Sequence, residues 1–143
     1  MRVVITEYAS NELDIRTIRD QVFIVEQQVP REQEIDDRDP ICLHALVYDQ
    51  QEPIATGRLD LAKGKVGRVA VLEPYRRCGV GSLVMRALEQ CALEAGLERI
   101  WFHAQLTAVP FYTSLGYRIC SEEFVEANIR HVMMDKDLNS QTN

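Results

Sequence analysis

Apolar and polar residues alternate along the chain with two periods, one typical of strands and one typical of helices. Residues 3–8 have the composition of a short strand. Ser10 or Asn11 then stands where a small polar side chain can cap a helix. Behind this cap, apolar residues recur at helical spacing: Ile15, Ile18, Val22 and Val25. The chain therefore opens with a strand followed by a helix.

The middle of the chain carries the pattern of an antiparallel hairpin. Two apolar runs, 42–49 and 54–61, flank a turn-like sequence that ends in proline. Apolar runs separated by a short polar turn usually pair with each other. A third strand, 65–72, follows a Lys-Gly turn.

Residues 79–95 predict the most regular helix, because their apolar side chains share one face and Gly96 stands where a left-handed C-terminal residue belongs. Gly116 stands in the same position after a shorter helix, 108–115. The remaining elements are a strand at 99–104, a short helix at 108–115 and strands at 117–120 and 131–135. This order of strands and helices predicts an α/β (α+β) fold in which helices flank a mixed sheet.

Length and composition support an ordinary globular protein. The chain has 143 residues, which fits one domain over 1–143, with 46% hydrophobic and 27% charged residues. Its net charge of −6 has the wrong sign for a protein that neutralises phosphates, so nucleic acid is disfavoured as a partner. No apolar run approaches the roughly 18 residues of a membrane span, and the N-terminus lacks a signal-peptide pattern. We expect a cytoplasmic protein with no membrane partner.

Cysteines and histidines do not predict a metal centre. No cysteine pair has C-x-x-C spacing, and no two histidines have the spacing of a shared helical face. We therefore expect free thiols and no metal. The residues concerned are Cys42, Cys78, Cys91, Cys120, His44, His103 and His131.

Residues 69–82 form a strand, a glycine-containing loop and the start of a helix. The first amides of a helix lack internal partners and lie at its positive end, so this segment can bind an anion such as a diphosphate. Gly79 and Gly81 would let phosphates approach, and Arg76 and Arg77 add positive charge. A simple tight turn is the alternative. The P-loop and the dinucleotide fingerprint fit poorly, because the sequence lacks G-K-S/T and a third small residue.

The sequence R-R-C-G-V-G at 76–81 resembles the acyl-CoA signature of the GNAT superfamily of N-acetyltransferases. The sequence A-V-P-F-Y-T-S-L-G-Y at 108–117 resembles a second segment of the same family at the usual distance. The expected order of elements is also that of the family. The resemblance implies a largely antiparallel sheet flanked by helices, with an acyl-CoA site where two central strands splay apart.

The resemblance also implies roles for particular residues. Tyr112 matches the position whose hydroxyl protonates the departing thiolate, although a packed core aromatic is the alternative. Gln105 stands near the place of an asparagine that binds the pantetheine arm. The backbone of Val69, Ala70 and Val71 would pair with that arm, and the loop of Arg76, Arg77, Cys78, Gly79, Val80, Gly81 and Ser82 would hold the pyrophosphate of acetyl-CoA.

An amine must lose a proton before it attacks a thioester, so the reaction needs a base or a water chain. Glu26 follows an apolar stretch that can raise the pKa of a carboxyl group. Likeness to one bacterial branch of the family favours Glu26 and His131 as the pair near the acceptor. His44 and His103 are the other candidates, and a solvated Glu26 or a core histidine is the alternative reading.

Residues 30–40 are rich in acidic side chains between two prolines, and residues 139–143 form a polar tail. We expect 30–40 to be a solvated acidic loop. It could also attract a cationic amine into the cleft. The acidic residues are Glu32, Glu34, Asp36, Asp37 and Asp39.

Taken together, the residues and the resemblance predict an acetyl-CoA-dependent N-acetyltransferase. The acceptor would be a small-molecule or peptide amine that attacks directly in a ternary complex. Cys78 in the loop and Cys91 on the core face of a helix are poor candidates for an acyl-enzyme nucleophile. The alternatives are a non-catalytic acyl-CoA-binding module and a dinucleotide-dependent enzyme. The protein would be a monomer or a homodimer.

Overall fold

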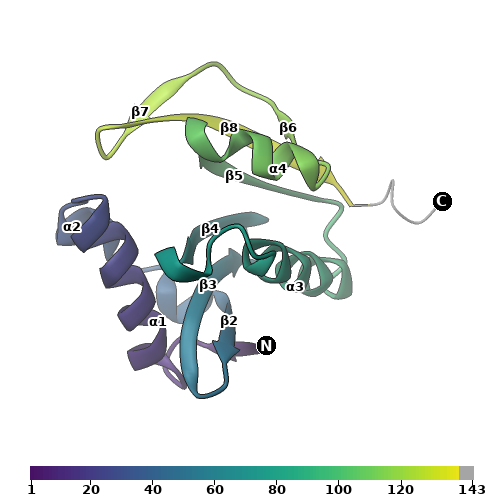
Figure 1. Ribbon diagram of the computed structural model, residues 1–143. Coiled ribbons are helices and arrows are strands. Elements are labelled where there is room, and N and C mark those ends of the chain that lie inside the picture. The colour runs from purple at the N-terminus through teal and green to yellow at the C-terminus, as the bar shows by residue number, and fades with distance from the viewer. Residues whose placement is uncertain (139–143) are drawn as a thin grey trace.

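A single mixed sheet of eight strands organises the computed structural model, which describes residues 1–138 (Figure 1). The strand order is β1-β2-β3-β4-β5-β8-β6, and β7 pairs with β8. The expected polar tail, 139–143, lies outside the described residues. The strands are β1 (Arg2–Glu7), β2 (Leu43–Asp49), β3 (Glu52–Asp60), β4 (Lys65–Val71), β5 (Arg99–Gln105), β6 (Arg118–Ile119), β7 (Phe124–Glu126) and β8 (Ile129–Asp137).

Helices lie on both faces of this sheet. They are α1 (Glu12–Arg19), which continues into the π-helical turn η1 (Asp20–Glu26), then α2 (Arg31–Glu34), α3 (Val80–Glu94) and α4 (Val109–Ser114). Three single turns of 3₁₀ helix complete the fold: η2 (Asp39–Ile41), η3 (Glu73–Tyr75) and η4 (Leu106–Ala108). No helix within residues 1–138 is long and apolar enough to span a membrane.

Alternate residues of the central strands serve two cores. In β2, Ala45 and Val47 belong to the cluster that includes α3, whereas Leu46 and Tyr48 belong to the cluster that includes α1. Successive side chains of a strand point to opposite faces, so a sheet covered on both sides needs apolar residues at nearly every position. This explains why the sequence shows continuous apolar runs there instead of a strict alternation.

Most of the expected elements are confirmed, with three corrections. Asn11 is the residue before α1, but its side chain donates to Oγ1 of Thr6 at 2.7 Å and makes no cap hydrogen bond. The expected helix through Val25 changes to the wider η1 turn after Arg19. Strand β7 was missed. It pairs with β8 through a hairpin whose turn, Ala127 and Asn128, has positive φ at both residues.

The strands β4 and β5 lie parallel but pair only at Lys65 and Trp101. An extra residue interrupts β4 just beyond this point: Gly67 faces Arg58 of β3, whereas Ala70 faces Thr56. Arg68 therefore lies in a β-bulge, with a left-handed φ of 51°. Bulges bend a strand and increase its local twist. The sheet opens here into two arms, β1–β4 and β5–β8, as the expected splay requires (Figure 1).

The acidic segment 30–40 is only partly solvated: it contains α2 and the start of η2, and two of its five carboxylates are buried. Glu34 and Asp39 are each only 2% exposed, because the buried Arg19 guanidinium lies between them. Arg19 donates to Glu34 at 2.8 Å and to Asp39 at 2.7 Å. Arg58 from β3 donates to the same Asp39 oxygen at 2.7 Å. The sequence alone showed the acidic residues, but their partners come from α1 and β3.

This network makes the free energy of unfolding sensitive to pH in the acid range. Arg58 hydrogen bonds hold the pKa of Asp36 below its usual range. Burial alone would raise the pKa of Asp39, but Arg19 and Arg58 outweigh it and leave that pKa lowered. A lowered carboxyl pKa stabilises the fold above the unfolded value, about 3.9, and this contribution is lost as pH falls toward the folded value.

We therefore expect the free energy of unfolding to fall steeply in acid, as measured by urea denaturation across a pH series. Asp39→Asn should cost about 3–5 kcal/mol at neutral pH, because it leaves buried guanidinium charge uncompensated, and should flatten the acid dependence. Asp37→Asn is the matched control, since Asp37 is exposed. An acid dependence equal in wild type and Asp39→Asn contradicts this account.

Candidate active site

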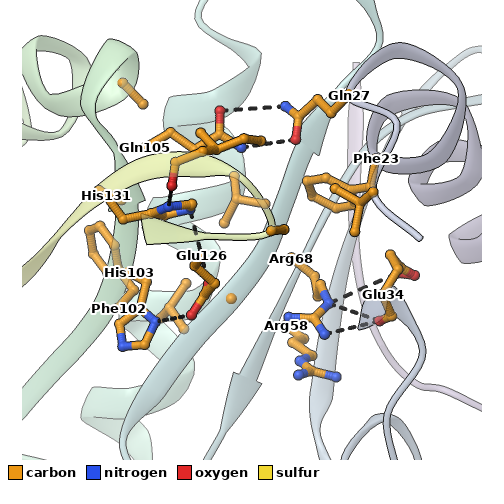
Figure 2. Close-up of a pocket in the computed structure, with 18 of the residues that line it drawn as sticks. Phe23, Gln27, Glu34, Arg58, Arg68, Phe102, His103, Gln105, Glu126 and His131 are labelled. Atoms are coloured by element: carbon orange, nitrogen blue, oxygen red, sulfur yellow. Dashed lines mark hydrogen bonds and ion pairs between the residues drawn. The ribbon is translucent and has the colours of Figure 1, made fainter. Parts of the chain in front are cut away.

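A cavity of about 490 Å³ opens where the two arms of the sheet diverge (Figure 2). One wall comes from β4, from Arg58 of β3 and from residues 33–36. The other wall comes from β5 and the β7–β8 hairpin. The end of η1 and the short helix α4 close the remaining sides. The side chains that face one another across the cavity are therefore far apart in the sequence.

The inner edge of β4 has no strand partner beyond Lys65. Val71 and Ala70 pair with β3 on the outer side, but β5 pairs with β8 over its full length instead of returning to β4. A free strand edge leaves amide and carbonyl groups for an extended ligand. The backbone of Val69, Ala70 and Val71 thus offers the kind of edge expected for a pantetheine arm.

The loop before α3 offers free amides. The first helical amide bond runs from Leu83 to the carbonyl of Gly79 at 3.3 Å, so the amides of Val80, Gly81 and Ser82 have no partner within the helix. Gly79 has φ of 80°, and no atom lies within 4 Å of the place a Cβ would take. The loop is exposed and its helix begins without an acidic residue. An anion can reach it.

Gly81 has a packing reason to be glycine. A Cβ at Gly81 would lie 2.9 Å from Cζ of Phe111, on α4. The missing side chain therefore makes room for the packing of α4 against α3. This reason stands beside the phosphate approach expected from the sequence.

Arg76 and Arg77 have different surroundings. Arg76 donates from Nη2 to both carboxylate oxygens of Glu26, at 2.9 and 3.1 Å, and from Nε to the Val71 carbonyl at 2.9 Å. The exposed Arg77 side chain has no hydrogen-bond or ion-pair partner within residues 1–138. Arg76 thus ties η1 to the end of β4, and Arg77 is the arginine of the loop that is free to meet an anion.

Glu26 and His131, expected as a pair, are not brought together. Glu26 is held by Arg76 and does not line the cavity, whereas His131 does. His44 is also outside the lining: it is 1% exposed, and its Nε2 lies 2.9 Å from the Asp39 carbonyl. The apolar stretch before Glu26 does not enclose its carboxylate, because the η1 turn points that side chain toward Arg76.

Glu126 is the carboxylate that joins the histidines of the site (Figure 2). Its Oε2 lies 2.8 Å from Nδ1 of His103, and its Oε1 lies 4.0 Å from Nε2 of His131. Nδ1 of His131 lies 2.7 Å from the Ile129 carbonyl, which can only accept, so Nδ1 carries the proton and Nε2 has a free lone pair. Sequence analysis missed Glu126. The Ala-Asn turn after it was the available signal for a hairpin.

Tyr112 projects from α4 into the same cavity and is 8% exposed. Its ring packs on Phe102 with centroids 4.5 Å apart. Within the described part of the chain its hydroxyl has no hydrogen-bond partner. Burial raises the pKa of Tyr112 well above its ordinary value, so the hydroxyl keeps its proton at neutral pH.

Gln105 also reaches the cavity, but another glutamine engages its amide. Nε2 of Gln105 donates to Oε1 of Gln27 at 2.9 Å, and Nε2 of Gln27 donates back at 3.5 Å. This reciprocal pair connects the end of η1 with the end of β5 (Figure 2). No group of three or more potential metal-ligating side chains occurs among residues 1–138.

The order of elements and the divided, largely antiparallel sheet are those expected from the resemblance to the N-acetyltransferases. A family profile for the acetyltransferase (GNAT) domain matches residues 6–138, and the chain belongs to this family.

Several known proteins are similar to the chain. The N-acetyltransferase YjcF of Bacillus subtilis, itself uncharacterized, is 41% identical over 96% of this chain and 100% of YjcF. The crystal structure of Escherichia coli ElaA superposes with a TM-score of 0.84 at 28% identity, over 96% of this chain and 100% of ElaA. An aminoglycoside 6′-N-acetyltransferase solved with coenzyme A shares the fold alone, with a TM-score of 0.72 at 15% identity over 96% and 97% of the two chains.

The contact between Gly81 and Phe111 predicts a packing defect. Gly81→Ala should cost about 1–3 kcal/mol in urea unfolding, because the new Cβ must displace a ring. Phe111→Leu in the same chain should recover part of this loss, which a double-mutant cycle measures. Gln90→Ala, exposed on the same helix, is the control. Gly81→Ala at wild-type stability contradicts the contact.

Proposed function

We propose that the protein transfers an acetyl group from acetyl-CoA to a primary amine, by direct attack within a ternary complex. The observation that carries this proposal is that one cavity joins the free edge of β4 to a protonated tyrosine and a histidine with a free lone pair. These are the groups that a thioester, its leaving thiolate and an attacking amine each require.

The free edge of β4 and the loop before α3 would hold acetyl-CoA. Main-chain groups of Val69, Ala70 and Val71 suit an amide-containing arm, and the first amides of α3 suit the pyrophosphate. Arg77 would add a charge-assisted contact to the phosphates. When bound, acetyl-CoA supplies an activated acyl group and a thiolate leaving group. The family membership and the coenzyme A complex of the aminoglycoside acetyltransferase support this assignment.

Tyr112 would give its proton to the leaving sulfur. Tyr112 lines the cavity, its hydroxyl has no hydrogen-bond partner among residues 1–138, and burial keeps it protonated. A positioned phenol can protonate a thiolate without ionising first, so a raised pKa is no obstacle to this role.

His131 would take the proton of the incoming amine. Its Nδ1–H is fixed by the Ile129 carbonyl, which leaves Nε2 to accept. Glu126 would act as a positioning residue, because its carboxylate favours the imidazolium that forms. We assign Glu26 no part in this transfer, because Arg76 binds both of its oxygens.

A thermal-shift titration with acetyl-CoA, CoA, NADH and ATP tests ligand choice, because a ligand that binds the folded state stabilises it by mass action. We expect a saturable shift with acetyl-CoA and CoA, weakened in Arg77→Gln. Thiol release with a panel of amines then tests turnover. Binding without CoA release from any amine would indicate an acyl-CoA-binding module, and a shift with NADH or ATP alone would reject the acyl-CoA site.

Tyr112→Phe should lower kcat on the order of 100-fold or more, because it removes the proton donor. Its affinity for acetyl-CoA should change little, since the ring remains. Tyr117→Phe is the matched control: its hydroxyl donates to Glu89 at 2.8 Å and does not line the cavity. An equal loss of kcat in both variants would assign Tyr112 to packing only.

The pH dependence of kcat/KM tests the base. Activity should fall in acid as the catalytic imidazole becomes protonated. His131→Gln should remove this acidic limb and most of the rate. Glu126→Gln should lower kcat but keep an acidic limb, because this carboxylate positions the histidines and does not itself take the amine proton. An acidic limb that stays in place in His131→Gln overturns the assignment.

A further inference from the structure

The two walls of the cavity carry opposite charge (Figure 2). Arg58, Lys65 and Arg68 line the wall formed by β3 and β4, whereas Glu126 lies with His103 and His131 on the other. An amine that enters this cavity therefore meets cations on one side and an anion with two imidazoles on the other. Resting on the acetyltransferase function proposed above, this arrangement bears on the class of acceptor.

The acidic side chains near the cationic wall are already occupied. Asp36 accepts from Arg58 through both oxygens, at 2.8 and 2.6 Å, and Glu34 accepts from Arg19 and Arg16 at 2.8 and 2.7 Å. These carboxylates cannot also serve as the site of a cationic acceptor without losing their partners. Recruitment of a cationic amine by the acidic segment, one of the expectations from the sequence, would therefore depend on the exposed Glu32 and Asp37.

The Lys65 ammonium and Nη1 of Arg68 are donors with no acceptor within residues 1–138. The half-buried Lys65 ammonium lies 5.1 Å from the Trp101 ring centroid and has no ion-pair partner within residues 1–138. Arg68 donates from Nε and Nη2 to the Glu34 carbonyl at 3.1 and 3.0 Å, its Nη2 also lies 3.3 Å from Oδ2 of Asp36, and its Nη1 has no acceptor within the described residues. Burial lowers the pKa of both groups and neighbouring cations add to this effect, whereas Glu126 offsets part of it at Lys65, and Asp36 and Glu34 offset part of it at Arg68. A bound anion beside the two cations would raise both pKa values again.

The backbone of Arg68 is also strained. Its φ of 51° is the left-handed conformation, which residues with a side chain rarely adopt. The bulge sets the Arg68 side chain at the cavity, where it runs beside Glu34 (Figure 2). Strained residues of this kind concentrate at binding sites.

We propose that the acceptor is a small zwitterion, an amine that carries a carboxylate. Its carboxylate would lie against Lys65 and Arg68, and its amine would face Glu126 and His131. The cationic wall then contacts the carboxylate of the acceptor, and the wall with Glu126 contacts its amine. A polyamine would place a second cation against Lys65 and Arg68, and the amine of a protein side chain would bring no anion to them.

The test compares amino acids with the amines left by their decarboxylation, such as lysine with cadaverine and tyrosine with tyramine. We expect kcat/KM for the better carboxylate-bearing acceptor to exceed that of its decarboxylated partner at least tenfold. Phosphoethanolamine against ethanolamine asks whether a phosphate serves as well. A preference for decarboxylated amines, or for a lysine-bearing peptide amide, overturns the inference and leaves the acetyltransferase function standing.

Lys65→Met keeps the aliphatic stem and removes the charge. It should reduce the preference for the carboxylate member of a pair about tenfold, mainly through KM. Lys63→Met makes the same change on an exposed lysine outside this cavity and should leave the preference unaltered. Equal effects of Lys65→Met on both members of a pair would contradict a carboxylate contact.

A binding measurement covers the case in which no amine is turned over. With CoA saturating, carboxylate-bearing amines should raise the melting temperature of the wild type more than that of Lys65→Met. Absence of any such shift, together with absence of turnover, overturns the inference. Failure of acetyl-CoA to bind at all is a separate result, because it removes the proposed function itself.

Discussion

The single pairing of β4 with β5, at Lys65 and Trp101, is the constraint on which the rest of the structure depends. Two contacts fix this closed end: the Trp101 amide donates to the Gly64 carbonyl at 3.1 Å, and its indole N–H donates to the Lys63 carbonyl at 2.9 Å. Beyond it each strand follows another partner, β4 staying with β3 and β5 with β8. The arms diverge without breaking the sheet, and unpaired backbone groups are left along the opening.

An opening of this kind must be held at a fixed width, because unpaired strand edges otherwise tend to pair. Side chains from η1 and the segment after it perform this task from one side. Gln27 reaches Gln105 on β5, and Glu26 binds Arg76 beyond the end of β4. The same short turn therefore contacts both arms. The buried arginine network of Arg19 and Arg58 fixes Glu34 and Asp39 of the acidic segment beside this wall.

Local pattern predicted the elements well because each depends on its own sequence. The hairpin of β2 and β3 and the glycine-ended helices follow from periodicity and turn residues. Candidate site residues could be proposed from the sequence only where they belong to a contiguous motif, as in 76–81 and 108–117. Glu126, the partners of Arg76 and the burial of Glu34 depend on segments that meet only in the folded chain. Periodicity carries no information about such contacts.

The acidic segment shows how this limit misleads. Five carboxylates between residues 30 and 40 indicate a solvated surface when the chain is taken alone. The structure supplies Arg16, Arg19 and Arg58 from α1 and β3, and two of the five carboxylates, Glu34 and Asp39, become buried in ion pairs. A segment with net negative charge therefore lies beside a cavity whose unpaired donors are cationic. A ligand meets only the charges that the protein does not pair internally. In this cavity those charges are the Lys65 ammonium and Nη1 of Arg68.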